Sequence, residues 1–265
     1  MAKICNCKKC HTNYDAFLSN CPICEHTNDT FPLDHRFSNI LFLTDIKLVL
    51  LAFIGAIGIF AFNVLFFLAF RNMPFDDNLK GTTVAFVTYI IVLSLLMCVI
   101  NVEYKKLFVT FTKVRPFLIA LICVAAVIGF YFAYVAILKA VKYNYAPSAY
   151  IDENNEMIKN LPALAFFNIV ILKPICEELA YRVGFFGIIR KHNRFLAYFA
   201  AVIIYGVVHL DLTNITNINE WVNFPIYLAQ SFALTALYEY EGLSSSLYAN
   251  IACNLFNFIF LFAIK

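Results

Sequence analysis

Charged residues are scarce in this sequence. Only 14% of its 265 residues are Asp, Glu, Lys or Arg, whereas 62% are hydrophobic. A soluble domain carries about 25% charged residues, so the composition excludes an ordinary soluble protein. The small net charge of +3 gives no indication of a nucleic-acid partner, and we expect none.

The sequence also lacks the alternation of polar and apolar residues that membrane-spanning strands require. Its apolar runs continue over about 18 residues or more, which indicates transmembrane helices rather than a β-barrel. Neither an internal repeat nor a low-complexity tract is visible. No long apolar run precedes Ile46, so we expect no secretory signal peptide. We therefore predict an all-α, polytopic helical membrane protein.

The apolar runs predict seven transmembrane helices that together cover most of the chain. They are Ile46–Phe70, Thr82–Asn101, Pro116–Val141, Leu161–Ile189, Phe195–Leu210, Val222–Tyr238 and Ser246–Ile264. Basic residues follow the second and fourth spans: Lys105, Lys106, Lys113, Arg115, Arg190, Lys191 and Arg194. Acidic residues dominate after the third and fifth: Asp152, Glu153, Glu156, Asp211 and Glu220. Because basic loops stay in the cytoplasm, we expect an integral protein of a bacterial inner membrane with a cytoplasmic N-terminus.

Five of the nine cysteines lie in the first 24 residues. Cys7 and Cys10 form one C-x-x-C pair, and Cys21 and Cys24 form another. Four thiolates at this spacing are typical of a closed structural zinc site, which has no open position for catalysis. Two disulfides are the alternative, which a reducing cytosol disfavours. The segment resembles short zinc-ribbon modules, and we predict a zinc knuckle that adds stability or docks a cytosolic partner.

The fourth predicted span carries a cluster of charges. Glu177, Glu178 and Arg182 lie in a largely apolar helix, with Lys173 one turn earlier. Each charge at membrane depth costs about 2.5–3.5 kcal/mol, so such a cluster indicates a functional site. Glu178 and Arg182, at i and i+4, are expected to pair. Glu177 points about 100° away and suits a general base acting on water. A structural ion-pair network is the alternative interpretation.

Polar residues in two later spans are further candidates. His209 is the one histidine in a predicted span, and Gly206 beside it allows a neighbouring helix to approach closely. Taken alone, His209 is also typical of a hydrogen-bonded histidine at the membrane–water interface. In the last span, Asn250, Asn254 and Asn257 form a polar stripe at i, i+4 and i+7. Such asparagines commonly join helices; the sharper hypothesis is that Asn254 donates a hydrogen bond to a developing oxyanion.

These residues resemble the motifs of the CPBP family of intramembrane proteases (CAAX-protease and bacteriocin-processing, also called Abi). The family pattern E-E-x-x-x-R matches Glu177, Glu178 and Arg182. The pattern F-x-x-x-H matches Tyr205 and His209, with one aromatic residue replacing another. The resemblance covers roughly residues 161–264, and the zinc knuckle and the first three spans lie outside it.

The third family motif, H-x-x-x-N, departs from the pattern. Asn254 stands where the family has histidine, with Asn257 or Phe258 near its asparagine; an alternative register pairs Asn250 with Asn254. A catalytic zinc usually has three protein ligands. Without a second histidine, the chain is not expected to bind a catalytic metal.

The resemblance implies an intramembrane endopeptidase that cleaves a peptide or protein substrate at the lipid bilayer. It implies Glu177 as the general base, His209 as the group that orients the water or the proton transfer, and Asn254 as the group that polarises the scissile carbonyl. Glu178 and Arg182 would hold Glu177 in place. We therefore divide the chain into the knuckle (1–26), a linker (27–45), three N-terminal helices with their loops (46–160) and a CPBP-like catalytic core of four helices (161–265).

Two other functions remain open. The degenerate third motif also fits a proteolytically inactive relative that binds peptides, for instance in bacteriocin immunity. A small transporter that uses Glu177, Glu178 and His209 as a proton relay is a further alternative, although no inverted repeat is visible. A cysteine protease built on Cys176 is not expected, because a thiol beside a carboxylate is a poor nucleophile.

Overall fold

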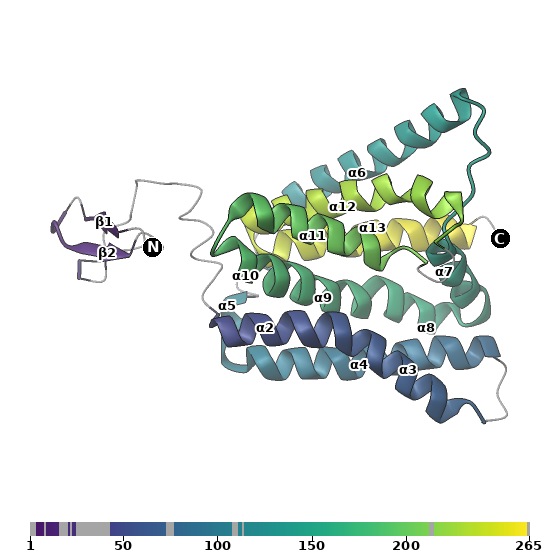
Figure 1. The fold of residues 1–265 in the computed structure, drawn as a ribbon, viewed down its shortest axis with the longest axis horizontal. Helices are drawn as coiled ribbons and strands as arrows, with labels where there is room; N and C mark the ends of the chain where they lie inside the picture. Colours follow the sequence, from purple (N-terminus) through teal and green to yellow (C-terminus); the bar gives the residue numbers. More distant parts are fainter. Residues whose placement is uncertain are drawn as a thin grey trace.

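A computed structural model describes residues 4–7, 9–15, 21, 23–24, 43–72, 77–107, 111–112, 114–211 and 215–263. The predicted linker, residues 27–45, lies outside this part of the chain except for its last three residues. The described residues are mostly helical, as predicted from the sequence (Figure 1).

A small β-hairpin begins the described chain. Strand β1 (Ile4–Asn6) pairs antiparallel with β2 (Asn13–Asp15). Between the strands, the backbone N–H of His11 donates to the carbonyl of Cys7 at 2.8 Å, and the N–H of Cys7 donates to the carbonyl of Thr12 at 2.9 Å. This tight turn holds the first C-x-x-C pair, with His11 in the left-handed region at φ 57°.

The rest of the described chain is a helical bundle. Its elements are α2 (Asp45–Phe53), η1 (Ile54–Gly58), α3 (Ile59–Phe70), α4 (Asp77–Ile100), η2 (Asn101–Glu103), α5 (Tyr104–Leu107), α6 (Val114–Ala140), α7 (Ala149–Asn160), α8 (Pro162–Phe166), η3 (Phe167–Leu172), α9 (Lys173–Glu177), η4 (Glu178–Phe186), α10 (Gly187–Arg190), α11 (Arg194–Val208), α12 (Ile218–Glu241) and α13 (Leu243–Ala263).

The seven predicted spans are helical over their described residues except at Val141, Leu161, His209 and Leu210 near span ends, and the chain is an integral membrane protein. In the part of the chain that the structure describes, four helices are long and apolar enough to cross a bilayer: Asp45–Phe70, Leu79–Ile100, Val114–Ala140 and Leu243–Ala263. Helix α11 is apolar but shorter. The segments 162–190 and 218–241 contain several charged residues, so seven crossings remain a prediction.

Helices α8 to α10 form one continuous helical segment at the centre of the bundle. It contacts α2 and α4 on one side and α11, α12 and α13 on the other (Figure 1). Two stretches of this segment, η3 and η4, are π-helical, and such turns are frequent at functional sites. Pro174 is the second residue of α9, where it removes one backbone donor from the helix.

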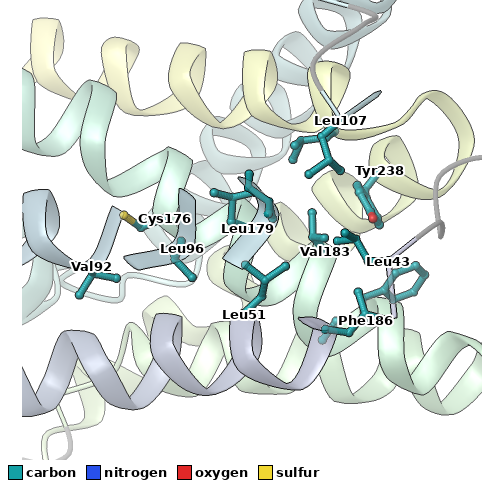
Figure 2. Close-up of a cluster of buried hydrophobic side chains, with 14 of the residues drawn as sticks. Leu43, Leu51, Val92, Leu96, Leu107, Cys176, Leu179, Val183, Phe186 and Tyr238 are labelled. Carbon is teal, nitrogen blue, oxygen red and sulfur yellow. The ribbon is translucent and has the colours of Figure 1, made fainter. Parts of the chain in front are cut away.

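One hydrophobic core joins the two parts into which the sequence was divided. Figure 2 shows Leu51 of α2, Leu96 of α4 and Leu179 of η4 in the same cluster, and all three are fully buried. Phe186 and Tyr238 extend this core toward α12. The N-terminal helices therefore support the central helix directly.

Small residues let α2 and η1 pack very closely against η4. A Cβ atom added to Gly55 would lie 2.1 Å from the Cβ of Ala180, and one added to Gly184 would lie 2.6 Å from the backbone nitrogen of Ala52. Contacts between such small residues are typical of tight helix pairs in membranes. Substitution at either glycine would push the two helices apart.

Helix α7 was not predicted from the sequence. It occupies the acidic segment after the third predicted span and begins at Ser148, whose extended backbone (φ −76°, ψ 160°) is that of an N-cap residue. The helix is polar overall, but Ile158 is fully buried on its inner side. Its backbone is tied to α12, because Glu220 accepts a hydrogen bond from the N–H of Ala149 at 2.8 Å.

At the opposite end of the bundle, basic residues pair with acidic ones. Glu239 is buried and accepts hydrogen bonds from Arg190 at 2.7 Å, from Arg194 at 3.0 Å and from the Tyr198 hydroxyl at 2.6 Å. The sixth predicted span ended at Tyr238, whereas α12 continues to Glu241. The Glu239 carboxylate thus balances the charges of Arg190 and Arg194 within the protein.

We expect Glu239→Gln to lower the free energy of unfolding in detergent by roughly 2–3 kcal/mol, because hydrogen bonds to charged groups contribute about that much. Glu241→Gln is the control, since the Arg115 that it contacts is largely exposed and exposed ion pairs contribute little. Equal unfolding midpoints for the two variants in urea or on heating would contradict this role of Glu239.

Candidate active site

The central helix buries both glutamates of the E-E-x-x-x-R motif. Glu177 is the last residue of α9 and Glu178 the first of η4, with exposed fractions of 3% and 0%. Arg182 is also completely buried. Burying three charged groups is costly unless each has partners, so their contacts indicate how the site is built.

Glu178 and Arg182 lie against each other, as the i, i+4 spacing predicts. The Nε atom of Arg182 is 3.6 Å from Oε1 of Glu178. The guanidinium also lies 4.6 Å from the centre of the Tyr205 ring, and its Nη2 donates to the Ser231 hydroxyl at 3.4 Å. Among the described residues, Oε2 of Glu178 and the Nε and Nη1 atoms of Arg182 have no hydrogen-bond partner. The pair is therefore held chiefly by charge and stacking.

Glu177 points away from this pair and meets groups from three helices. Its Oε1 is 3.9 Å from Nζ of Lys173 and 3.6 Å from Nε2 of His209. Its Oε2 accepts a hydrogen bond from Nδ2 of Asn250 at 3.3 Å. None of these three contacts is short. The Glu177 carboxylate can therefore still accept a proton from another donor.

His209 is fixed at the C-terminal end of α11. Its Nδ1 lies 2.8 Å from the carbonyl oxygen of Tyr205. Since a carbonyl only accepts, Nδ1 carries the hydrogen and Nε2 faces Glu177. The ring packs against the rings of Tyr150, Tyr205 and Tyr227 at centroid distances of 4.8, 4.2 and 5.1 Å. These aromatic contacts set its orientation.

The close helix approach predicted at Gly206 is confirmed. A Cβ atom on this residue would lie 2.7 Å from the Phe224 ring of α12 and 2.8 Å from Leu228. Gly206 therefore brings α12 against the turn of α11 that precedes His209.

The last helix contributes Asn250, to which the sequence analysis assigned no catalytic role. Its Nδ2 donates to both glutamates, at 3.3 Å to Glu177 and 3.0 Å to Glu178. Asn254 donates in turn to the carbonyl oxygen and the side-chain oxygen of Asn250, both at 2.9 Å. Asn257 is exposed. The i, i+4 spacing of the stripe was the available signal, but it does not reveal which member faces the glutamates.

A cavity of about 750 Å³ adjoins the glutamate–histidine contact. Side chains from five segments line it: Lys173, Glu177 and Tyr181 from the central helix, Asn63 from α3, Tyr89 from α4, Glu153 and Glu156 from α7, and His209 and Asp211 after α11. Glu178, Arg182, Asn250 and Asn254 are not among its lining residues. Of the five predicted site residues, Glu177 and His209 thus line the cavity and the other three do not.

Cys176 lies away from this cavity. It is completely buried in the hydrophobic core, and its thiol donates to the carbonyl oxygen of Tyr89 at 3.7 Å. The thiol is therefore not among the groups that line the cavity.

The four N-terminal cysteines form a separate cluster. Their Sγ atoms lie within 4.8 Å of one another, and the structure gives all four as free thiols. Cys7 is 3.5 Å from Cys24, and Cys10 is 3.4 Å from Cys21, near the ~3.8 Å expected for tetrahedral ligands at 2.3 Å from zinc. Hydrogen bonding with Thr12 lowers the pKa of the Cys10 thiol to about 6, which favours the thiolate that zinc binds.

No comparable ligand set exists at the glutamate site within the described residues. It offers the His209 imidazole and the Glu177 carboxylate, while Glu178 is engaged by Arg182 and Asn250. Amide side chains are poor zinc ligands. The donor set therefore falls short of the three ligands of a catalytic zinc.

Comparison with known proteins supports the family resemblance. Residues 159–256 match the family model described as type II CAAX prenyl endopeptidase Rce1-like. The UPF0177 protein YvdC of Lactococcus lactis subsp. lactis is 27% identical over 115 residues, which cover 43% of this chain and 41% of that relative. The matched segment thus spans less than half of the relative's length. No solved structure matches the chain significantly. The CPBP resemblance is confirmed, and residues 159–256 form an Rce1-like segment.

Proposed function

We propose that this protein is an intramembrane endopeptidase that hydrolyses a peptide bond with a water molecule activated by Glu177. The observation that carries the proposal is the arrangement of Glu177 and His209, which come from different helices and face each other at the wall of one cavity. The Rce1-like match supports it, because the description of that family names an endopeptidase.

The tautomer of His209 suggests how the water is held. Its Nε2 and the Oε1 atom of Glu177 both accept hydrogen bonds and lie 3.6 Å apart. One water at a normal hydrogen-bond distance of about 2.8 Å from each atom would donate a hydrogen to both. In the reaction, Glu177 accepts a proton as the water oxygen attacks the carbonyl carbon. That proton then goes to the leaving nitrogen as the peptide bond breaks.

The remaining motif residues hold this pair. Asn250 bridges the two glutamates, and Asn254 orients Asn250. We therefore assign Asn254 a positioning role in place of the carbonyl-polarising role that the resemblance implied. Lys173, which lines the cavity 3.9 Å from Glu177, is better placed to stabilise a developing oxyanion.

Two alternatives make different predictions. A proteolytically inactive relative would bind peptides in the same cavity without cutting them. A proton-coupled transporter would use Glu177 and His209 as relay groups, and proton-driven uptake by liposomes containing the protein would support it. The endopeptidase is preferred because the general base and its partner histidine lie together, as the family motifs require.

The experiment that tests the proposal compares peptide termini in cells carrying the wild-type protein, the Glu177→Gln variant or a gene deletion. Termini that appear only with the wild type would support proteolysis and identify substrates. Identical termini in all three strains, with the variant still complementing the deletion phenotype, would instead support the peptide-binding alternative.

We further propose that the cysteine cluster binds one structural Zn²⁺ on the cytoplasmic side of a bacterial inner membrane and docks a cytosolic partner. Cys21→Ser is expected to remove zinc, measured as metal per chain by mass spectrometry, because a segment this short depends on metal for folding. Cys98→Ser, at an exposed site in α4, is the control. Full zinc content in the Cys21→Ser variant would contradict the four-thiolate site.

A further inference from the structure

Asn168 is a buried side chain with an unused hydrogen-bonding group in the proposed active-site cavity. It belongs to η3, is 2% exposed, and lines the same cavity as Glu177. No described residue provides a hydrogen-bond partner for its Oδ1 atom. Leaving a buried amide oxygen unpaired is unfavourable, and native proteins seldom do so without a reason. Nothing in the sequence motifs draws attention to this residue.

The π-helical turn explains how Asn168 comes to face the cavity. In an α-helix, positions five residues apart point about 140° away from each other. In η3 the wider i→i+5 turn brings them nearer to one face. Asn168 thereby joins Lys173. The α-helical step of four along α9 then adds Glu177, and Tyr181 follows in the first turn of η4. All four side chains line the cavity.

The spacing along the helix suits an extended peptide. Glu177 lies nine positions after Asn168, a distance of at most about 13 Å at the α-helical rise of 1.5 Å per residue. An extended chain covers that distance in about four residues at 3.3 Å each. If an extended substrate runs along this helix with its scissile bond at Glu177, the substrate residue beside Asn168 is therefore about four residues from that bond.

We propose that Asn168 binds the backbone of the substrate about four residues from the scissile bond. This inference depends on the proposed peptidase function and specifies its substrate class. The amide oxygen accepts a hydrogen bond from a backbone N–H, which must be free. Inside a helix that N–H is already bonded to a carbonyl four residues earlier, so the substrate segment is extended or locally unwound.

The test uses a fluorescence-quenched ten-residue peptide that the wild-type protein selects from a random library. With Asn168→Leu, we expect KM to rise about 5- to 15-fold while kcat stays within about twofold, because one or two hydrogen bonds to bound substrate are lost. Since Oδ1 is unbonded in the free protein, the melting temperature should be unchanged or higher. Asn101→Leu, at an exposed position in η2 that does not line the cavity, is the matched control and should leave KM unchanged.

Backbone methylation of the peptide locates the contact. A single N-methyl group about four residues from the cleaved bond should weaken cleavage by the wild type but have no further effect on Asn168→Leu. Equal effects on both proteins, or an unchanged KM in Asn168→Leu, would overturn the inference. Equal cleavage of the linear peptide and of the same peptide stapled into a helix would also overturn the inference.

Failure of this inference is distinguishable from failure of the proposed function. If Glu177→Gln abolishes cleavage but Asn168→Leu has a wild-type KM, only the role of Asn168 is rejected. If Glu177→Gln cleaves normally, the mechanism is rejected, and fluorescence polarisation with the same peptide still measures whether Asn168 contributes to binding. A protein that neither cuts nor binds any library peptide would reject both.

Discussion

Replacing Glu177 by glutamine is expected to lower kcat for peptide cleavage by roughly 10²–10⁴-fold, the usual contribution of a general base. Glutamine keeps the size of the side chain and its contact with Asn250, but it does not accept the proton of the attacking water. The protein should fold normally, because no short ion pair is lost: the charged neighbours of Glu177 lie at 3.6 and 3.9 Å. The measurement is single-turnover cleavage by purified protein in detergent.

Two variants serve as controls for this result. Cys176→Ala changes the preceding residue, which faces the hydrophobic core, and should retain nearly full activity. Glu177→Asp keeps a carboxylate but withdraws it by one methylene, so partial activity is expected. Full activity of the glutamine variant would refute the general-base role, and loss of activity in Cys176→Ala would refute the water-based mechanism.

Replacing Arg182 by methionine is expected to produce the largest loss of stability, about 3–5 kcal/mol. The substitution leaves the Glu178 carboxylate buried without its ion-pair partner, and breaking a buried pair from one side costs about that much. Both residues have exposed fractions of 0%, so solvent does not offset the loss. The measurement is the unfolding midpoint in detergent, with peptide binding as a check on the native state.

A double substitution separates charge from packing. Glu178→Gln combined with Arg182→Met removes both charges, and we expect it to be less destabilising than Arg182→Met alone. If the double variant is instead as unstable as the sum of the two single variants, the pair is not coupled, and the guanidinium acts through its contacts with Tyr205 and Ser231.

The helices and the central charged pair were predictable because they depend on residues close in sequence. Long apolar runs indicate helices in a membrane, and the i, i+4 spacing places Arg182 beside Glu178. The cysteine cluster was predictable for the same reason, because each C-x-x-C pair is a local turn.

Contacts between helices that are distant in the sequence were harder to predict. Asn250 and Asn254 are equivalent in the sequence stripe, and only the rotation of α13 against the central helix determines that Asn250 meets the glutamates. The π-turn η3 changes which residues face the cavity, and it leaves no clear trace in the sequence. Helix α7 was missed because its polar residues are typical of a loop, whereas its single buried side chain, Ile158, is a tertiary effect.

The close packing at Gly55 and Gly184 makes the two halves of the first helix differ in how tightly they are held against the rest of the bundle. Where backbones touch, as α2 does with the central helix, neither helix slides without a clash. Beyond the π-turn η1, helix α3 has no buried residue, yet Ile59, Phe60 and Asn63 line the cavity. The first helix is therefore held by backbone contact along one half and only by partly exposed side chains along the other. For the proposed peptidase, we expect a membrane-bound substrate to enter past the second half, because its residues lie between the cavity and the lipid.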